Sequence, residues 1–243
     1  MTLLDVTPRR SSADQSSNLD AAADTGVVTI TDTTELRWFA EGQLPPQVAA
    51  WFTNDATSGL IEQRCDTYRM DGRFDTGLKR RSGETLELKV RRSVGERLVV
   101  GPGLAGHLEV WRRWSPAECL VIRSKNVPWV DVQKTVVKRR FSVTGDEIAL
   151  AADARAMIGA GCEVEVAAVS VNDIEGWTFA FAAFGPIEER RSSMLASMQA
   201  LARDGSHPEW LGPFFGPSSS YPEWLALVAS RTSALSSCDL RRR

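Results

Sequence analysis

The chain has 243 residues, of which 43% are hydrophobic and 25% charged, and its formal net charge is −2 at pH 7. These proportions are typical of a water-soluble globular protein, and the near-zero net charge argues against nucleic acid or an acidic membrane as a partner. The four cysteines have no CxxC spacing, which argues against a zinc knuckle or a disulfide framework.

The N-terminal segment, residues 1–26, is rich in Ser, Ala, Asp and Thr and contains no aromatic residue. It lacks the apolar side chains that a packed core needs, so we expect a disordered or extended segment. No apolar run in the chain has the character of a signal peptide or the length of a membrane span. We therefore expect a cytoplasmic protein that is not bound to membranes.

The first strand is expected at residues 27–39, where β-branched and aromatic residues are frequent. Within it Thr33, Glu35 and Arg37 share one face, because successive side chains of a strand point to opposite faces. A short helix is expected after the Leu44-Pro45-Pro46 sequence, since proline is tolerated in the first turn of a helix.

Residues 60–70 and 76–81 are the next expected strands, followed by the clearest strand pattern of the chain at residues 86–91. There Leu86, Leu88 and Val90 alternate with three charged residues. The pair Ser82-Gly83 predicts a tight hairpin that places Lys79 and Arg81 on the face of those charges. The alternation allows this face either to lie in water or to line an anion-binding interior.

Later strands are expected at residues 109–114, 129–143, 162–171 and 177–184, and a short apolar run occupies 120–122. A change to helical spacing predicts a helix over residues 187–202, and a second short helix is expected near 222–231. The predicted fold class is mainly β (α+β). The predicted domains are an extended segment at 1–26, a β domain with flanking helices at 27–203, and a C-terminal loop, helix and tail at 204–243.

Charge is unevenly distributed along these elements. Residues 64–92 contain 9 basic and 5 acidic side chains, and residues 112–140 contain 8 basic and 2 acidic ones. Residues 1–63 instead contain 3 basic and 9 acidic side chains. A closed sheet would bring both signs together inside one cavity.

The order of five short motifs resembles the CYTH superfamily, also called triphosphate tunnel metalloenzymes. The motifs are TELR, DTYRMD, GLKRR, LELKVRR and CEVEV, and the resemblance spans residues 27–185. It implies a closed or nearly closed antiparallel β-barrel of eight strands with flanking helices. The tunnel of such a barrel binds a triphosphate together with a divalent metal, Mg²⁺ or Mn²⁺.

The resemblance also implies roles for single residues. The expected catalytic residues are Glu35 and Lys89, and the expected metal ligands are Glu35, Glu163 and Glu165. The expected substrate-binding residues are Arg37, Lys79, Arg81, Lys89, Arg91, Lys134, Lys138 and Arg140. The family signature Glu-x-Glu-x-Lys corresponds here to Thr33-x-Glu35-x-Arg37, so one candidate metal ligand is replaced by a neutral hydroxyl.

Three functions follow as alternatives. The first is metal-dependent hydrolysis of inorganic, nucleoside or thiamine triphosphate, and the second is binding of phosphate, polyphosphate or a nucleotide without catalysis, at a degenerate metal site. The third is a structural or partner-binding β protein whose charges face water and whose aromatic C-terminal segment is the contact surface. The expected partner is a small phosphate-containing anion and not a nucleic acid, and the oligomeric state, including a homodimer, is left open.

Overall fold

The computed structural model describes residues 6–7, 28–53, 61–82, 85–116, 121–122, 127–144, 147–150, 159–202 and 209–240. Its strands are β1 (Val6–Thr7), β2 (Val28–Glu41), β3 (Ile61–Arg69), β4 (Thr76–Arg81), β5 (Thr85–Gly101), β6 (Leu104–Pro116), β7 (Val121–Ile122), β8 (Trp129–Thr144), β9 (Glu147–Leu150), β10 (Ala160–Val171) and β11 (Ile174–Phe184). The helices are α1 (Pro46–Thr53), α2 (Ile187–Ala202), the 3-10 helix η1 (Glu209–Phe214) and α3 (Tyr221–Leu240).

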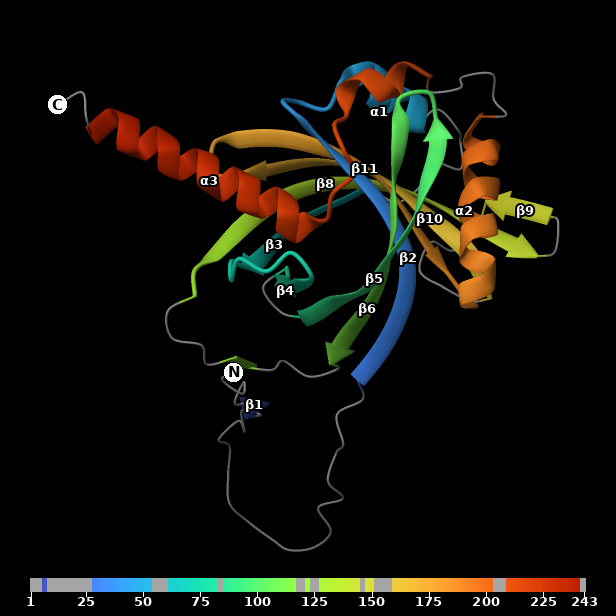
Figure 1. Ribbon diagram of the computed structural model, residues 1–243, viewed down its shortest axis with the longest axis horizontal. Coiled ribbons are helices and arrows are strands. Elements are labelled where there is room, and N and C mark those ends of the chain that lie inside the picture. The colour runs from blue at the N-terminus through green and yellow to red at the C-terminus, as the bar shows by residue number, and fades with distance from the viewer. Residues whose placement is uncertain are drawn as a thin grey trace, which may run out of the picture.

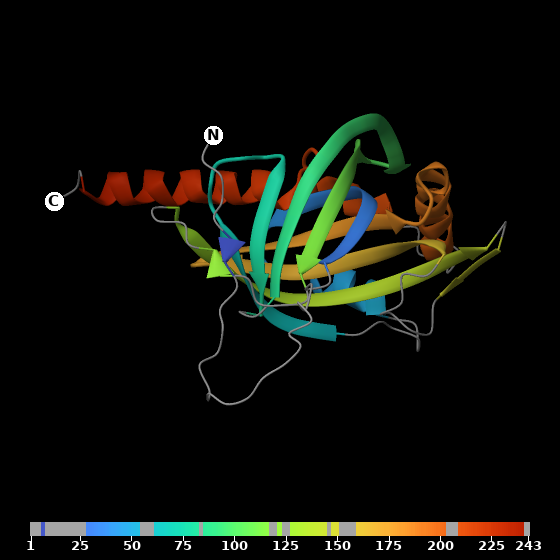
Figure 2. The same cartoon turned by 90° about the horizontal axis from the view of Figure 1, so that it is seen from below.

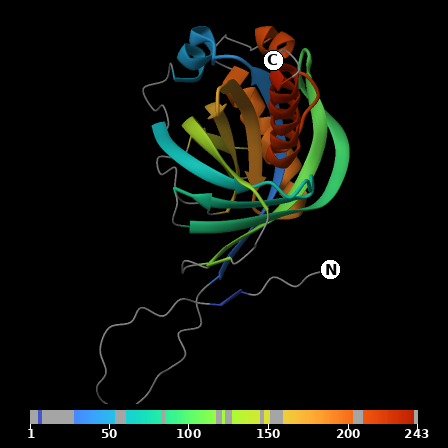
Figure 3. The ribbon, with the colours of Figure 1, turned by 90° about the vertical axis from the view of Figure 1, so that its left-hand side faces the viewer.

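Eight antiparallel strands form a ring-like sheet. Their order is β10-β11-β2-β6-β5-β4-β3-β8, and β8 also pairs with β10, so the first and last strands of this series are neighbours. Strand β9 extends the sheet beyond β8, and β1 pairs with β7 as a separate ribbon. Figures 2 and 3 show the strands curving around a common interior.

The outward face of the sheet at β2, β10 and β11 is covered by helices (Figure 1). Trp38, Phe179 and Phe181 from these strands are almost fully buried there, packed with Phe52 of α1 and Met194 of α2. Helix α1 begins where expected, because the Pro45 carbonyl accepts hydrogen bonds from the backbone of its first turn. This cluster is the main apolar core, and it leaves the inward-facing positions for other chemistry.

One end of the ring interior is apolar and is filled by α3. Val132, Ala167 and Val169 line it, and Trp224 and Leu225 of α3 pack against them. The remainder of α3 extends away from the ring, as Figures 1 and 2 show.

Helix α3 begins with a capping box. The Glu223 carboxylate accepts a hydrogen bond from the Ser220 backbone amide at 2.8 Å, and the Ser220 hydroxyl accepts one from the Glu223 amide at 3.5 Å. This cap fixes the first turn of the helix inside the ring.

Most expected elements are present, and the largest differences in extent concern three of them. Strand β5 runs to Gly101 instead of ending near Arg91, through register shifts that interrupt the alternation of its side chains. Strand β6 begins at Leu104, well before the expected start. The C-terminal helix has 20 residues and is longer than expected. The expected extended segment at 1–26 lies outside the described residues, apart from the two residues of β1.

Candidate functional site

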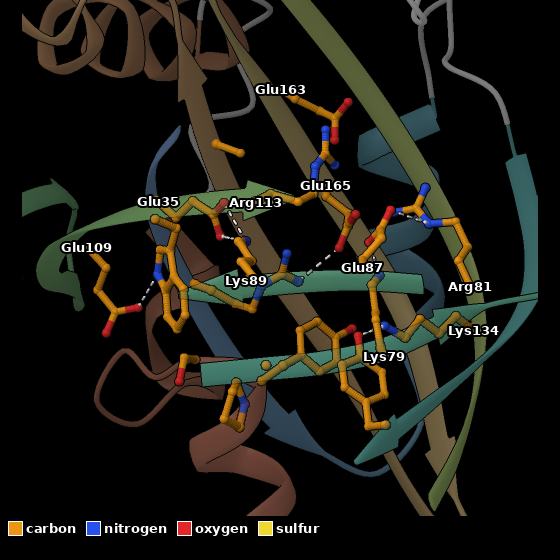
Figure 4. Close-up of a pocket in the computed structure, with 18 of the residues that line it drawn as sticks. Glu35, Lys79, Arg81, Glu87, Lys89, Glu109, Arg113, Lys134, Glu163 and Glu165 are labelled. Carbon is orange, nitrogen blue, oxygen red and sulfur yellow. Dashed lines mark hydrogen bonds and ion pairs between the residues drawn. The ribbon is translucent and has the colours of Figure 1, made fainter. Parts of the chain in front are cut away.

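A charged cavity occupies the ring interior beside the apolar end. Its volume is about 150 Å³, and eight basic and five acidic side chains line it. Figure 4 shows ten of these side chains projecting toward a common space. The basic ones are Arg37, Arg64, Lys79, Arg81, Lys89, Arg113, Lys134 and Lys138, and the acidic ones are Glu35, Glu87, Glu109, Glu163 and Glu165.

The register of neighbouring strands brings these side chains to the same face. Lys79 lies opposite Glu87, and Lys89 lies between Gly77 on one neighbouring strand and Arg113 on the other. Directly opposed residues of antiparallel strands project to the same side of the sheet. Because the side chain of Lys89 projects inward, the register also determines which side chains of the neighbouring strands project inward.

Asp66 on β3 is the most deeply buried acid of the site. It is fully buried, and the amino groups of Lys79 and Lys134 both lie 3.1 Å from its Oδ2, while Arg64 Nε lies 3.2 Å from Oδ1. Burial disfavours its charged form, but the three cations outweigh this effect and hold the pKa of Asp66 below its usual value. One carboxylate thus neutralises only part of the positive charge around it.

Two glutamates face each other across β2 and β6. Glu35 and Glu109 are paired in register, and Glu35 accepts hydrogen bonds from Lys89 at 2.5 and 2.6 Å and from the Thr33 hydroxyl at 2.5 Å. Glu109 accepts a hydrogen bond from Trp111 Nε1 at 2.9 Å. Burial raises the pKa of Glu109, whereas the pKa of Glu35 is lowered because the nearby lysine outweighs the effect of burial.

The glutamates of β10 are tied to basic side chains. Glu165 lies 2.9 Å from Arg37 and 3.7 Å from Lys138, and Glu163 lies 2.8 Å from Lys138 and 2.5 Å from Arg140. Burial opposes ionisation of Glu165, but the charge of Arg37 prevails and lowers its pKa. Both glutamates therefore form ion pairs with the basic residues of β2 and β8.

Two tyrosines form an aromatic wall of the cavity. The rings of Tyr68 and Tyr221 are stacked with centroids 5.5 Å apart, and the Lys134 amino group lies 4.8 and 3.9 Å from these centroids. Arg37 lies 4.8 Å from the centroid of Tyr221. Because Tyr221 is the first residue of α3, the C-terminal helix contributes directly to the cavity.

The charged forms of Lys79 and Lys134 are disfavoured by their surroundings. Burial is the main reason that the pKa of each lysine is lowered, and for Lys134 the neighbouring charge of Lys79 adds to this effect. A bound anion would relieve the repulsion between these cations.

The expected metal ligands do not form a metal site in this arrangement. Among the described residues, no group of three or more His, Cys, Asp or Glu side chains is placed to hold a metal ion. Glu35, Glu163 and Glu165 each have basic partners, and Thr33 offers its hydroxyl to Glu35. The donor set as arranged does not fit Mg²⁺ or Mn²⁺, which prefer several carboxylate oxygens and waters.

Most residues expected to bind substrate line the cavity, and two lie at its margin. Arg91 binds Glu109 and lies 2.9 Å from Glu223 of α3. Arg140 is buried and is paired with Glu163, while its Nε and Nη1 atoms have no hydrogen-bond partner among the described residues. The roles of all these residues remain predictions, but Lys89 and Arg91 lie on the inside of the ring, not on a wet outer face.

Several further cavity residues were not expected from the sequence, among them Arg64, Glu109, Arg113 and Tyr221. Residues 109–114 carry tryptophan and arginine on both faces, so alternation does not indicate which face is inward. Because Arg113 is paired in register with the inward-facing Lys89, the face of β6 that carries Arg113 is the inward one. Tyr221 belongs to a helix that begins more than 100 residues after the end of β6, and no local sequence pattern connects it with the strands of the cavity.

Comparisons with protein-family models, curated proteins and solved structures give no match to this chain. No helix in the described part of the chain combines the length and apolar character that crossing a membrane requires. The geometry of the cavity therefore carries the functional argument.

Proposed function

We propose that this protein binds a polyphosphate anion, such as tripolyphosphate or a triphosphate ester, in the charged cavity of the ring. The observation that carries the proposal is the convergence of eight basic side chains on a partly enclosed space, against five acidic side chains that line it and the buried Asp66, which pairs with three of the eight. Charge-assisted hydrogen bonds to phosphate are strong where water is largely excluded and donors are held in place.

The arrangement of the basic residues supports a chain of phosphates over a single small anion. Lys79 and Lys134 converge on Asp66 at one side, and Lys89 and Arg113 come from β5 and β6 at another. The cations therefore reach the cavity from several strands around the ring. An extended anion with about four negative charges matches such a distribution better than one phosphate does.

The proposal includes two structural expectations. The ring is taken to be a closed eight-stranded barrel, which the additional pairing of β8 with β10 supports. The chain is taken to be a divergent CYTH-like protein. This is supported by Glu35, Lys79 and Lys89, which belong to the motifs of the resemblance and line the cavity. Metal-dependent hydrolysis remains a prediction, because the acidic side chains as arranged do not form a metal site.

Calorimetric titration of the purified chain with tripolyphosphate at low salt tests the proposal. We expect saturable binding to the wild type and at least about tenfold weaker binding to the Arg113→Gln variant, since one charge-assisted contact is worth about 1.5–3 kcal/mol. Arg113 suits this test because its side chain makes a hydrogen bond to Thr31 at 3.4 Å and no ion pair in the described residues. Its removal leaves no acid unpaired.

Arg92→Gln is the matched control, because Arg92 is an exposed residue of β5 that does not line the cavity. Binding that is absent in the wild type, or equally weakened by both substitutions, contradicts a site inside the ring. Repeating the titration with Mg²⁺ or Mn²⁺ while measuring phosphate release separates binding from hydrolysis.

A further inference from the structure

Lysine is rare in this chain but frequent in the charged cavity. Of the 29 basic residues of the sequence, all are arginines except Lys79, Lys89, Lys125, Lys134 and Lys138. Four of these five lysines line the cavity, and Lys125 lies outside the described residues. Both side chains bind phosphate, but a guanidinium keeps its proton in proteins, whereas a lysine can lose one and become a nucleophilic amine. The cavity therefore contains most of the side-chain amines of this protein.

Among these lysines, Lys134 of β8 is the most enclosed. Its side chain is only 2% exposed, compared with 34% for Lys89. Lys134 nevertheless lines the cavity, at the side where Lys79 also lies (Figure 4). Because an ammonium group loses hydration when it is buried, burial favours the uncharged amine and lowers the pKa of Lys134.

Three cations share the carboxylate of Asp66, and Lys134 is the one with no second acidic partner. Its amino group and that of Lys79 both lie 3.1 Å from Asp66 Oδ2, and Arg64 binds the same side chain. Lys79 and Arg64 each form an ion pair with a further glutamate, whereas the only ion pair of Lys134 in the described part of the chain is the one with Asp66. Loss of a proton from Lys134 therefore breaks the fewest ion pairs and removes its repulsion with Lys79.

A proton donor lies next to this amine. The Tyr68 hydroxyl oxygen is 2.7 Å from the Lys134 amino group, and burial raises the pKa of this phenol, so that it remains protonated. The ring of Tyr221 stacks on that of Tyr68, but its hydroxyl has no hydrogen-bond partner among the described residues. Of the two tyrosines, Tyr68 is therefore the one placed to exchange a proton with a group formed at the amine.

We propose that the Lys134 amino group forms an imine with a small phosphorylated aldehyde that is bound in the charged cavity. The phosphate of this ligand is held by the other basic side chains of the cavity. The inference goes beyond the proposed function, because it needs one phosphate group and an aldehyde instead of a chain of phosphates.

The reaction balances without an oxidant or a reductant. The lone pair of the Lys134 nitrogen adds to the carbonyl carbon, and the carbonyl oxygen takes a proton from the Tyr68 hydroxyl, which recovers one from the nitrogen. The hydroxyl group so formed leaves as water with the second hydrogen of the amine. One amine and one aldehyde thus give one imine and one water, and protonation of the imine restores a positive charge beside Asp66.

Reductive trapping tests the inference. The purified chain is incubated at pH 7 with glycolaldehyde phosphate and cyanoborohydride, and the labelled lysines are identified by mass spectrometry of its peptides. An ordinary lysine with a pKa of about 10.4 is uncharged in only about 1 in 2,500 molecules at this pH. We expect labelling of Lys134 to be at least about tenfold faster than that of Lys89, because burial favours the uncharged amine. Accessibility alone predicts the opposite order, since Lys89 is the more exposed.

Glycolaldehyde without the phosphate is the matched ligand. It presents the same carbonyl group but has no anion for the basic side chains to hold. At equal concentration it should label Lys134 at least about tenfold more slowly, since a charge-assisted contact is worth at least that factor in affinity.

The Tyr68→Phe substitution tests the proton donor. It keeps the stacked ring and removes the hydroxyl, so labelling of Lys134 should slow at least about tenfold. Tyr221→Phe is the matched control, because it removes a hydroxyl from the other ring of the stack that is not bonded to Lys134. It should slow the labelling far less, and equal rates in the two variants contradict proton donation by Tyr68.

Three results in the wild type overturn the inference: faster labelling of Lys89, no labelling of Lys134, and equal labelling by the two aldehydes. Calorimetric titration of the same preparation with tripolyphosphate tests the proposed function separately. If tripolyphosphate binds and Lys134 is not labelled, the proposed function stands and the imine is wrong. If Lys134 is labelled and tripolyphosphate does not bind, the imine stands and polyphosphate binding is wrong.

Discussion

The inward-facing acids of the site have structural roles that can be measured through pH. Glu87 is nearly buried, and Lys79 lies 3.1 Å and Arg81 3.2 Å from its carboxylate. Burial opposes its ionisation, but these charges prevail and bring the pKa of Glu87 to about 2. Because the pKa is lower in the folded chain, ionised Glu87 stabilises the fold above the unfolded pKa of about 4.3, and this contribution is lost as pH falls toward 2.

We therefore expect the free energy of unfolding to fall by about 3 kcal/mol from Glu87 alone between pH 5 and pH 2. The Glu87→Gln variant should show a shallower pH dependence in urea denaturation measured over this range. Glu96→Gln is the control, since Glu96 is exposed and paired with Arg191 outside the cavity. An unchanged slope in Glu87→Gln would contradict the ion-pair assignment.

The buried lysines predict proton uptake on anion binding. The pKa values of Lys79 and Lys134 are lowered in the free protein, whereas a bound polyanion favours their charged form. Binding should therefore take up protons at alkaline pH, and the affinity should decrease as pH rises through the pKa values of these lysines. Other charged and titratable groups face these lysines and also influence their protonation. They are Arg37, Arg64, Asp66, Tyr68, Arg81, Glu87, Glu165 and Tyr221.

Titration with tripolyphosphate at pH 9 in two buffers of different ionisation enthalpy measures this uptake. The observed heats should differ in proportion to the protons taken up by the protein. Lys134→Met should reduce the difference, while Arg92→Gln on the outer face should preserve it. Identical heats in the two buffers for the wild type would show that the lysines are already charged before binding.

At the level of single residues, alternation is a good guide where one face is uniformly apolar. Leu86 and Leu88 are apolar neighbours of Lys89, and Lys89 lies in the cavity, as a charged interior requires. Alternation is insufficient for Glu109 and Arg113, whose strand carries aromatic and charged residues on both faces. The partners of Asp66 are not predictable from local patterns, because its three cations come from β3, β4 and β8.

At the level of elements, α3 links the C-terminal segment to the site. Trp224 stacks on Phe39 of β2 with ring centroids 4.8 Å apart and planes at 7°, and Tyr221 meets the same phenylalanine at 5.0 Å. These contacts fill one end of the ring and place Ser220, Tyr221 and Pro222 at the cavity. The sequence predicts a short helix there, but its docking depends on residues of β2 and β3 that are far away in the chain.

Removing the anchor of α3 should destabilise the fold substantially. Trp224→Ala deletes a side chain of a residue that is only 8% exposed, and substitutions of this type cost about 3–5 kcal/mol. Urea denaturation should show this loss, and hydrogen exchange should show faster exchange in the first turns of α3. Leu227→Ala, at a residue that is 59% exposed on the same helix, should change stability by no more than about 0.5 kcal/mol. Similar effects of both substitutions would contradict the docking of α3 through Trp224.

At the level of the whole molecule, the net charge of the chain does not reflect the charge of its cavity. The chain is slightly acidic overall, yet the cavity has a surplus of basic side chains. The surplus arises because seven of the eight basic side chains come from the two basic segments, residues 64–92 and 112–140, whose strands all contribute to the cavity. Composition could predict the segregation of charge, but only the strand order decides which charges meet.

The position of the surplus predicts how ligands should affect global stability. An anion that binds the folded ring and not the unfolded chain stabilises it by mass action, by about 2.7 kcal/mol at a ligand concentration of about 100 times Kd. Tripolyphosphate should therefore raise the Tm in a concentration-dependent manner, whereas chloride at equal ionic strength should not, because screening alone does not provide several linked phosphates for one cavity.

A comparison of the wild type with Arg113→Gln and Arg92→Gln shows where the stabilising anion binds. The dose of tripolyphosphate that gives a fixed rise in Tm should increase at least about tenfold for the cavity variant and remain unchanged for the outer-face variant. Added salt should weaken the effect only gradually, since partly buried charges are screened less than exposed ones. A rise in Tm that disappears equally in both variants would instead indicate diffuse binding to the exterior, which the overall charge of −2 makes unfavourable.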